Sequence, residues 1–176
     1  MAKILSIVLI VFTLSALAAA PLRAELGIGG GVFYNRQLGD IKDDDGFDKD
    51  FISYMVSVKY ELISLLAVEG SLDYYPGNDK AVDYTLRPMA TGLVQLSFLN
   101  AGVGINSTYT KYDSPAGSSK DKWSDMSYHF KAGIQLDFFD LLWICGDCYY
   151  FVDDLKDIED FDSDLLTFGA RAFIPF

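Results

Sequence analysis

The last twelve residues, Leu165–Phe176, read Leu-Leu-Thr-Phe-Gly-Ala-Arg-Ala-Phe-Ile-Pro-Phe. Counted back from Phe176, every second residue is apolar, whereas the residues between them include Thr167, Gly169 and Arg171. Alternation with a period of two predicts a β-strand that has one apolar face and one face able to carry a charge. A strand at the end of a chain needs a hydrogen-bonding partner along each edge, and the first strand of the same chain is the simplest second partner. We therefore expect a sheet that closes on itself.

The opening residues predict a secretory signal. Lys3 precedes the largely apolar stretch Ile4–Leu17, and three alanines follow. This stretch is too short to span a membrane and leads into a cleavage-type region. A cut after the three alanines would leave Pro21 as the next residue, which signal peptidases generally reject. We therefore expect cleavage after Ala24 and a mature chain that begins at Glu25. The predicted organisation is thus a signal peptide over 1–24 and one domain over 25–176.

Charge and composition narrow the class of protein. The chain carries a net charge of −11, and loss of the two cations in residues 1–24 brings the mature chain to −13. Nucleic acid is therefore not an expected partner. Half of the residues (51%) are hydrophobic and 15% are aromatic, yet the mature chain contains no apolar run long enough for a membrane helix. This combination is typical of a membrane β-barrel, whose lipid-facing residues alternate with polar ones.

Alternation elsewhere in the chain predicts seven further strands. They cover residues 25–35, 51–62, 66–75, 85–98, 101–112, 126–138 and 142–152. Long polar loops over 37–50, 76–84, 113–125 and 153–164 alternate with short turns at 63–65, near 100 and at 139–141. This pattern predicts an all-β fold, an eight-stranded antiparallel up-and-down transmembrane β-barrel with its short turns in the periplasm and its long loops outside.

Aromatic residues on the apolar faces gather toward both ends of the predicted strands. The residues toward the long loops are Tyr34, Tyr54, Tyr74, Tyr109, Tyr128, Tyr150 and Phe168, and those toward the short turns are Tyr60, Phe98, Phe138 and Phe176. Ten steps of roughly 3.3 Å separate Tyr128 from Phe138, which at a tilt of about 40° spans on the order of 25 Å, the height of an outer-membrane apolar band. A soluble eight-stranded barrel such as a lipocalin has no reason to place tyrosines in rings. We expect these residues to form two membrane girdles.

With these strands, girdles and a terminal aromatic, Glu25–Phe176 resembles the eight-stranded bacterial outer-membrane β-barrel family. The resemblance is to the transmembrane domain of outer-membrane protein A and to opacity-type surface proteins. It implies an outer-membrane location among lipids and lipopolysaccharide, a monomer, and a closing strand whose Phe176 is the signal read by the barrel-assembly machinery after delivery by periplasmic chaperones. Because the chain ends with the predicted barrel, the resemblance implies no peptidoglycan-binding domain.

The polar faces of the predicted strands carry most of the ionisable groups of the barrel. They are Lys59, Glu61, Glu69, Asp73, Arg87, His129, Lys131, Asp137, Asp147 and Arg171. Side chains fill the interior of an eight-stranded barrel, so charges there must be paired or hydrated. We expect a structural network of ion pairs. The alternative, suggested by the resemblance to outer-membrane protein A, is a gated ion path.

The sequence offers little for catalysis. His129 is the only histidine, and outer-membrane lipid A deacylases, which are barrels of this size, carry a His-x-Ser pair. Here Lys131 stands where that serine would be, and Ser127 lies before the histidine. We therefore expect no catalytic residues and no cofactor.

Two other features suggest sites and are better explained as structure. Cys145 and Cys148 are three strand steps, about 10 Å, apart, beyond the roughly 7 Å limit for a disulfide, so we expect unpaired thiols unless Gly146 and Asp147 form a tight turn. The aspartates at 43–45 do not match the spacing of an EF-hand loop. Solvated acidic loops without a metal are the expectation.

From the sequence we expect a non-enzymatic integral outer-membrane protein with a surface or structural role. A small-solute pore or ion channel is the alternative, and a lipid-modifying enzyme comes third.

Overall fold

In the computed structural model the described residues are 25–35, 52–76, 82–112, 122–139, 141–156 and 166–176. The predicted signal peptide and most of the predicted acidic loops lie outside them. The strands are β1 (Glu25–Tyr34), β2 (Ile52–Ile63), β3 (Leu66–Pro76), β4 (Val82–Leu96), β5 (Leu99–Asn106), β6 (Tyr109–Tyr112), β7 (Lys122–Trp123), β8 (Ser127–Phe138), β9 (Leu142–Val152) and β10 (Leu166–Pro175). No helix among the described residues is long and apolar enough to cross a membrane.

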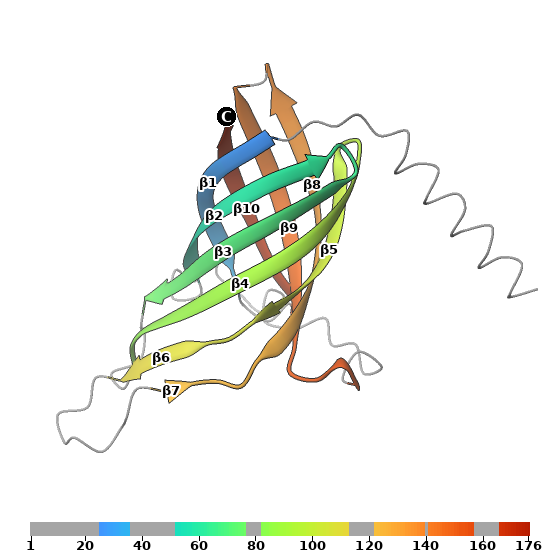
Figure 1. The fold of residues 1–176 in the computed structure, drawn as a ribbon. Helices are drawn as coiled ribbons and strands as arrows, with labels where there is room; N and C mark the ends of the chain where they lie inside the picture. The colour runs from blue at the N-terminus through green and yellow to red at the C-terminus, as the bar shows by residue number, and fades with distance from the viewer. Residues whose placement is uncertain (1–24, 36–51, 77–81, 113–121, 140, 157–165) are drawn as a thin grey trace, which may run out of the picture.

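The strands form one antiparallel sheet that closes into a barrel (Figure 1). The first and last strands pair from Gly27 opposite Pro175 to Tyr34 opposite Phe168. Around the ring the strands follow in the order β1, β2, β3, β4, β5, β8, β9 and β10. The pairing of β3 with β4 completes this order. Closure leaves no open edge around the barrel wall, because each long strand has a backbone hydrogen-bonding partner on both sides. Among the described strands the short β7 pairs with β6 alone. The predicted pairing of the C-terminal strand with the first strand is confirmed.

Ten strand segments make eight barrel strands. β5 and β6 both pair with β4, and only Ser107 and Thr108 separate them. β7 and β8 pair in turn with β6 and β5, so they are also two pieces of one strand. The predicted eight-stranded antiparallel barrel is therefore confirmed, with two of its strands interrupted at the loop end.

Two predicted boundaries were wrong. β4 begins at Val82 rather than at residue 85, because its first residues pair with β6 through a register shift between Val82 and Tyr84. The second short turn lies at Ser97 and Phe98 rather than near Asn100, which belongs to β5. Ser97 has a φ of 57°, the left-handed backbone conformation that tight hairpin turns use.

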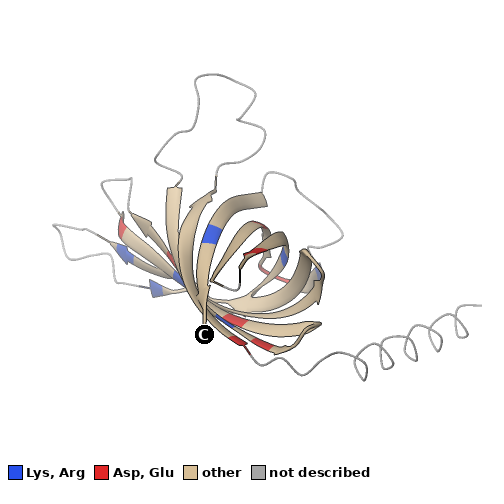
Figure 2. Ribbon diagram, turned by 90° about the horizontal axis from the view of Figure 1, so that it is seen from above, with Lys and Arg blue, Asp and Glu red and all other residues tan. Residues whose placement is uncertain are grey.

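The barrel is polar inside and apolar outside. Along β2, for example, buried Met55, Ser57 and Lys59 alternate with exposed Val56 and Val58. The same alternation places valine, leucine, isoleucine and aromatic side chains on the outer surface of every long strand. Figure 2 shows acidic and basic positions on several strands around the ring. An apolar exterior of this kind suits a hydrocarbon environment rather than water.

Glycines on the inner faces lie opposite bulky inward side chains of the neighbouring strand. Gly29 is paired with Phe173, and a Cβ atom on Gly29 would overlap the ring of Phe173 and the carbonyl oxygen of Ala172. Gly169 is likewise paired with Phe33, whose ring lies over it. The glycines of the first strand thus have a physical role, because glycine provides the space that a narrow barrel needs for large interior side chains.

The outward orientation of Val56 on β2 can be tested by placing a charged side chain there. Val56→Arg should lower the free energy of unfolding by roughly 2 to 4 kcal/mol, because an arginine near the middle of a membrane strand must leave water. Val56→Leu, which keeps an apolar side chain at the same place, is the control and should change stability little. Urea titrations of protein folded into phospholipid vesicles measure both variants, and a harmless Val56→Arg would contradict the outward orientation of Val56.

The glycine packing can be tested by a single methyl group. Gly29→Ala should cost about 1 to 3 kcal/mol, since the added carbon meets an aromatic ring and a backbone carbonyl. Gly70→Ala on β3 is the matched control, because no atom lies within 4 Å of the added carbon there. Equal stability of the two variants in the same vesicle titration would show that Gly29 is not needed for packing.

Candidate functional site

Four charged side chains from four strands meet at the centre of the barrel. Arg171 of β10 contacts Glu69 of β3 (Nη1 to Oε1, 2.7 Å) and Asp147 of β9 (Nη2 to Oδ2, 2.8 Å). Lys131 of β8 contacts the same two carboxylates, with Nζ 2.9 Å from Glu69 Oε2 and 3.3 Å from Asp147 Oδ1. All four side chains are buried. We call this set the central quartet, and its two positive and two negative charges cancel.

Neutral polar groups add hydrogen bonds to the central quartet. Tyr149 donates its hydroxyl proton to Glu69 Oε1 at 3.2 Å, and Ser71 donates to the same oxygen at 3.1 Å. Arg171 also donates from Nη1 to Ser57 Oγ at 2.8 Å. Glu69 therefore receives hydrogen bonds from two cations and two hydroxyl groups. Such saturation offsets the cost of removing these charges from water.

A second polar layer lies toward the short turns. Lys59 contacts Glu61 (Nζ to Oε1, 3.1 Å) and donates to Gln135 Oε1 at 2.5 Å, while Gln95 donates to Glu61 Oε1 at 3.0 Å. Asp137 was predicted to belong to the buried network, and this prediction was wrong. Its side chain is exposed, because it lies next to the last residue of β8 at the open end of the barrel, where it accepts a hydrogen bond from Gln135.

A third layer lies toward the long loops. Buried Asp73 is opposite half-buried Arg87 in the β3–β4 register. The prediction that Arg87 is held by ion pairs was wrong for the described part of the chain, where it has no carboxylate oxygen within 4.0 Å. Its guanidinium group instead lies 4.2 Å from the centre of the Phe151 ring and 5.7 Å from that of Tyr75. Aromatic stacking near the solvent-facing end replaces a salt bridge here.

His129 lies in the interior but outside the ion pairs. It is fully buried, with Nε2 2.8 Å from Thr91 Oγ1 and Nδ1 3.2 Å from Asn106 Nδ2. Ser127 donates to Asn106 Oδ1, so the amide nitrogen of Asn106 faces the ring. An amide nitrogen only donates, and this assignment makes Nδ1 an acceptor and Nε2 the protonated nitrogen. His129 is therefore a neutral hydrogen-bonding group, contrary to its predicted place in a charge network.

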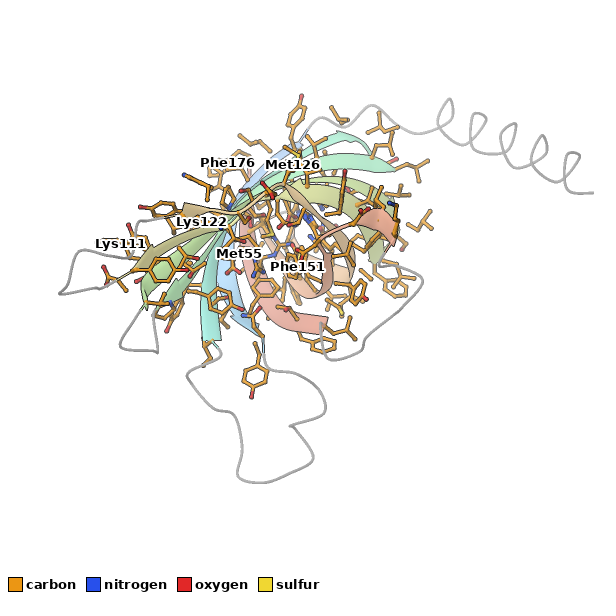
Figure 3. All side chains as sticks on the ribbon, turned by 90° about the horizontal axis from the view of Figure 1, so that it is seen from below. Met55, Lys111, Lys122, Met126, Phe151 and Phe176 are labelled. Atoms are coloured by element: carbon orange, nitrogen blue, oxygen red, sulfur yellow. The ribbon has the colours of Figure 1, made fainter. Side chains whose placement is uncertain are left out.

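Apolar side chains close the interior on both sides of the central quartet. Phe33, Met55, Met89 and Tyr149 form a buried cluster on the loop side, and Trp143, Cys145 and Phe173 form one on the turn side. The Arg171 guanidinium lies between them, 5.9 Å from the Phe33 ring centre and 5.0 Å from that of Phe173. In Figure 3, which looks into the loop end, Met55 and Phe151 lie inside the ring of strands. Side chains rather than open space occupy the described interior.

The predicted girdle residues lie on the outward alternation, with one difference. Tyr54, Tyr60, Tyr74, Phe98, Phe138 and Phe168 are exposed, whereas Tyr34, Tyr109 and Tyr128 are half-buried. Tyr150 was expected on the lipid-facing surface, but it is only 7% exposed. Its register partners on the neighbouring strands are Phe130 of β8 and Leu166 of β10.

The remaining candidate residues have clear positions. Phe176 is exposed, and its backbone exchanges hydrogen bonds with Leu26 of β1, at 2.7 Å and 3.3 Å. Cys145 is buried in the interior, whereas Cys148 lies on the outward alternation beside Phe168. Both thiols are free, and their opposite directions on one strand prevent a disulfide.

The comparisons with known proteins agree with this architecture. Residues 4–171 match a family model described as outer membrane protein beta-barrel domain. The chain belongs to this family. It is therefore a protein of the bacterial outer membrane, surrounded by the lipids and lipopolysaccharide of that membrane. The expected family, fold and location are confirmed.

Two solved structures show the likeness of the fold. The attachment invasion locus protein Ail of Yersinia pestis is 18% identical over 88% of this chain and 99% of that chain, with a TM-score of 0.55. The N-terminal β-barrel domain of Pseudomonas aeruginosa OprF is 11% identical over 88% of this chain and 100% of that chain, with a TM-score of 0.57. A comparison with curated protein sequences found no significant match.

The central quartet and the loop-side arginine can be separated by mutation. Arg171→Met should cost about 3 to 5 kcal/mol, because it leaves two buried carboxylates with one cation. Arg87→Met removes a stacked guanidinium near the barrel end and should cost less, about 1 to 2 kcal/mol. Urea unfolding in vesicles measures both variants. An equal loss of stability would show that burial and ion pairing do not determine which substitution costs more.

Proposed function

We propose that this outer-membrane barrel is a non-enzymatic surface or structural protein whose interior is closed to solutes. The observation that carries the proposal is the filled interior. Two apolar clusters flank the central quartet. Contacts between strands that are not neighbours cross the barrel from Arg171 to Glu69 in the quartet and from Lys59 to Gln135 in the layer toward the short turns. An ion entering from either end would have to displace buried side chains and break paired charges.

The outward side of the proposal rests on the loops. The segment 36–51 contains six aspartates and falls outside the described residues, while Asp153 and Asp154, which follow the loop end of β9, are exposed. We propose that these acidic loops meet the exterior of the cell. The Ail structure contains a heparin analogue, sucrose octasulfate, which is a strongly anionic ligand. The acidic loops of this chain would repel a ligand of that charge.

The chemistry available in the barrel supports a non-enzymatic role. His129 is enclosed by Thr91, Asn106 and the rings of Tyr149 and Phe151, and Ser127 donates its hydroxyl proton to Asn106. A histidine that activates a nucleophile on a lipid must reach the lipid-facing surface, and this one faces the interior. Mass spectrometry of lipid A from cells with and without the protein tests this part. An acyl chain lost only in the presence of the protein would overturn it.

One feature favours the alternative of a small-solute pore or ion channel. Glu69 contacts both Arg171 and Lys131, so it has two cationic partners between which its carboxylate could be exchanged. Exchange of partners within the quartet could open a path past it. This alternative requires the two apolar clusters to move as well, and that requirement makes it the second candidate.

Ion conductance in planar lipid bilayers decides between the two functions. The closed-interior proposal predicts no single-channel current for the full-length mature protein, and also none for Glu69→Gln, which loosens the central quartet without removing volume. A channel gated by the quartet should instead show current in the unmodified protein and a changed open fraction in Glu69→Gln. The buried Ser53→Ala, whose hydroxyl group bonds to Asn35 and lies outside the contacts of the central quartet, is a control for general disturbance. Repeated current steps from the unmodified protein would overturn the closed-interior proposal.

We further propose that residues 1–24 direct secretion and that Phe176 directs assembly, by way of periplasmic chaperones and the barrel-assembly machinery. Phe176→Ser should leave removal of the signal after Ala24 intact and reduce the amount of folded barrel. The terminal side chain is exposed, so the substitution removes no interior contact. Heat-modifiable migration on gels reports folding, and N-terminal sequencing reports the start at Glu25. Normal folding of Phe176→Ser in cells would contradict the assembly role.

A further inference from the structure

A row of aromatic rings crosses four strands on the outer face of the sheet at its loop end. Tyr74 of β3, Tyr84 of β4, Tyr109 of β6 and Trp123 of β7 follow one another with ring centres 6.0, 6.3 and 5.2 Å apart. Tyr74 and Trp123 are exposed, and the two rings between them are half-buried. We call these four residues the aromatic row.

The aromatic row leaves the barrel wall along a sheet extension. β4 pairs with β5 over Met89–Leu96, but its earlier part, Val82–Leu86, pairs with β6, which in turn pairs with β7. Figure 1 shows β6 and β7 beyond the barrel body, at the end opposite the chain terminus. At its other end the row joins the outward surface of the barrel, because Tyr74 is paired with the exposed Tyr54 of β2. One end of the row therefore lies on the membrane-facing surface and the other lies beyond it, on the loop side.

A paired charge accompanies the rings. Lys111 lies with Nζ 5.2 Å from the centre of the Tyr84 ring and 2.9 Å from Asp83 Oδ2, and both charged side chains are nearly half exposed. In Figure 3 Lys111 lies at the outer edge of the molecule. The ammonium and carboxylate groups compensate each other, so the surface is not a strong anion site. It offers ring faces beside hydrogen-bond donors and acceptors.

This combination matches the chemistry of sugars. A sugar ring has an apolar face of C–H groups that packs on an aromatic ring, and its rim of hydroxyl groups bonds to charged side chains. The spacing between successive rings of the row is close to the length of one sugar unit. In the outer leaflet of the membrane, sugars lie directly beyond the acyl region, which is where the row passes from the barrel wall to the sheet extension.

We propose that the aromatic row binds the core sugars of an outer-leaflet glycolipid, those beyond the acylated sugars of its lipid anchor, with Lys111 and Asp83 hydrogen-bonding to their hydroxyl groups. Binding there would fix the depth and orientation of the sheet extension on the membrane surface. The inference needs the outer-membrane location and does not depend on whether the barrel interior is closed. A positive conductance result would therefore leave it standing.

Trp123 provides a direct test, because the protein has only two tryptophans and the other, Trp143, is buried in the barrel. Trp143→Phe leaves Trp123 as the only tryptophan reporter. The mature protein is folded into vesicles of phosphatidylcholine alone, with added lipid A, or with lipopolysaccharide that carries its core sugars. We expect quenching of Trp123 by acrylamide to fall, and its emission to shift to shorter wavelength, only with the core sugars.

Three results would overturn the proposal. Equal quenching in all three vesicles would mean that sugars do not cover the row. Equal protection in phosphatidylcholine and in the sugar-bearing vesicles would make the row part of the membrane girdle alone. Protection that increases with the protein-to-lipid ratio in phosphatidylcholine would indicate a second copy of the chain on this face.

A binding measurement covers the case in which Trp143→Phe does not fold. The isolated core oligosaccharide is titrated into the detergent-folded protein and its dissociation constant is measured by calorimetry. The double variant Tyr84→Ala/Tyr109→Ala should weaken binding about tenfold, the loss expected when stacking partners are removed. Thr110→Ala lies on the opposite face of β6, where Thr110 is paired with Thr85 and Lys122, and should have no effect. Unchanged affinity in the double variant would contradict the assignment.

Discussion

The rest of the structure depends on closure of the sheet between β1 and β10. In hydrocarbon an unpaired backbone N–H or C=O group costs several kcal/mol, so a strand protein can cross a membrane only if its sheet has no free edge. Eight strands closed in this way enclose a narrow interior. Each inward side chain then competes for space, which explains why Gly29 and Gly169 stand opposite Phe173 and Phe33. Closure thus determines both the apolar exterior and the crowded interior.

A narrow polar interior imposes its own condition, because charges placed there cannot be hydrated freely. The central quartet meets the condition by equal numbers of opposite charges, each with more than one partner. Nearer the ends of the barrel, charged groups have less need of an ion-pair partner. Asp137 is exposed there, and Arg87 stacks on Phe151. The need for ion pairing is therefore greatest at the centre of the barrel and smaller at its ends. This difference explains why Arg171 and Arg87, which both face the interior, differ in their contacts.

The sheet extension carries the outer face of the sheet further toward the loops than the closed wall of the barrel. β4, β6 and β7 continue the pairing past the barrel, and the aromatic row continues with them. The row therefore passes through two environments, acyl chains near Tyr74 and the headgroup region near Trp123. Tyrosine and tryptophan suit that passage, since each has an apolar ring and a polar group. The surface of this protein is thus organised by the layers of the membrane outside it, as its interior is organised by charge.

The alternation of side chains along the chain determined the strands, their inward and outward faces, the eight-stranded closure and the outer-membrane location, because a period of two is a local property that every strand carries in its own sequence. It also identified the inward ionisable residues. It did not determine which of them meet, since Glu69, Lys131, Asp147 and Arg171 come from four strands and their contacts depend on register and on the curvature of the wall. For the same reason the burial of Tyr150, the neutral hydrogen bonds of His129 and the ring contacts of the aromatic row were decided only by the tertiary structure. The sequence of one strand determines which side chains point inward or outward, whereas the contacts between side chains of different strands depend on the closed sheet.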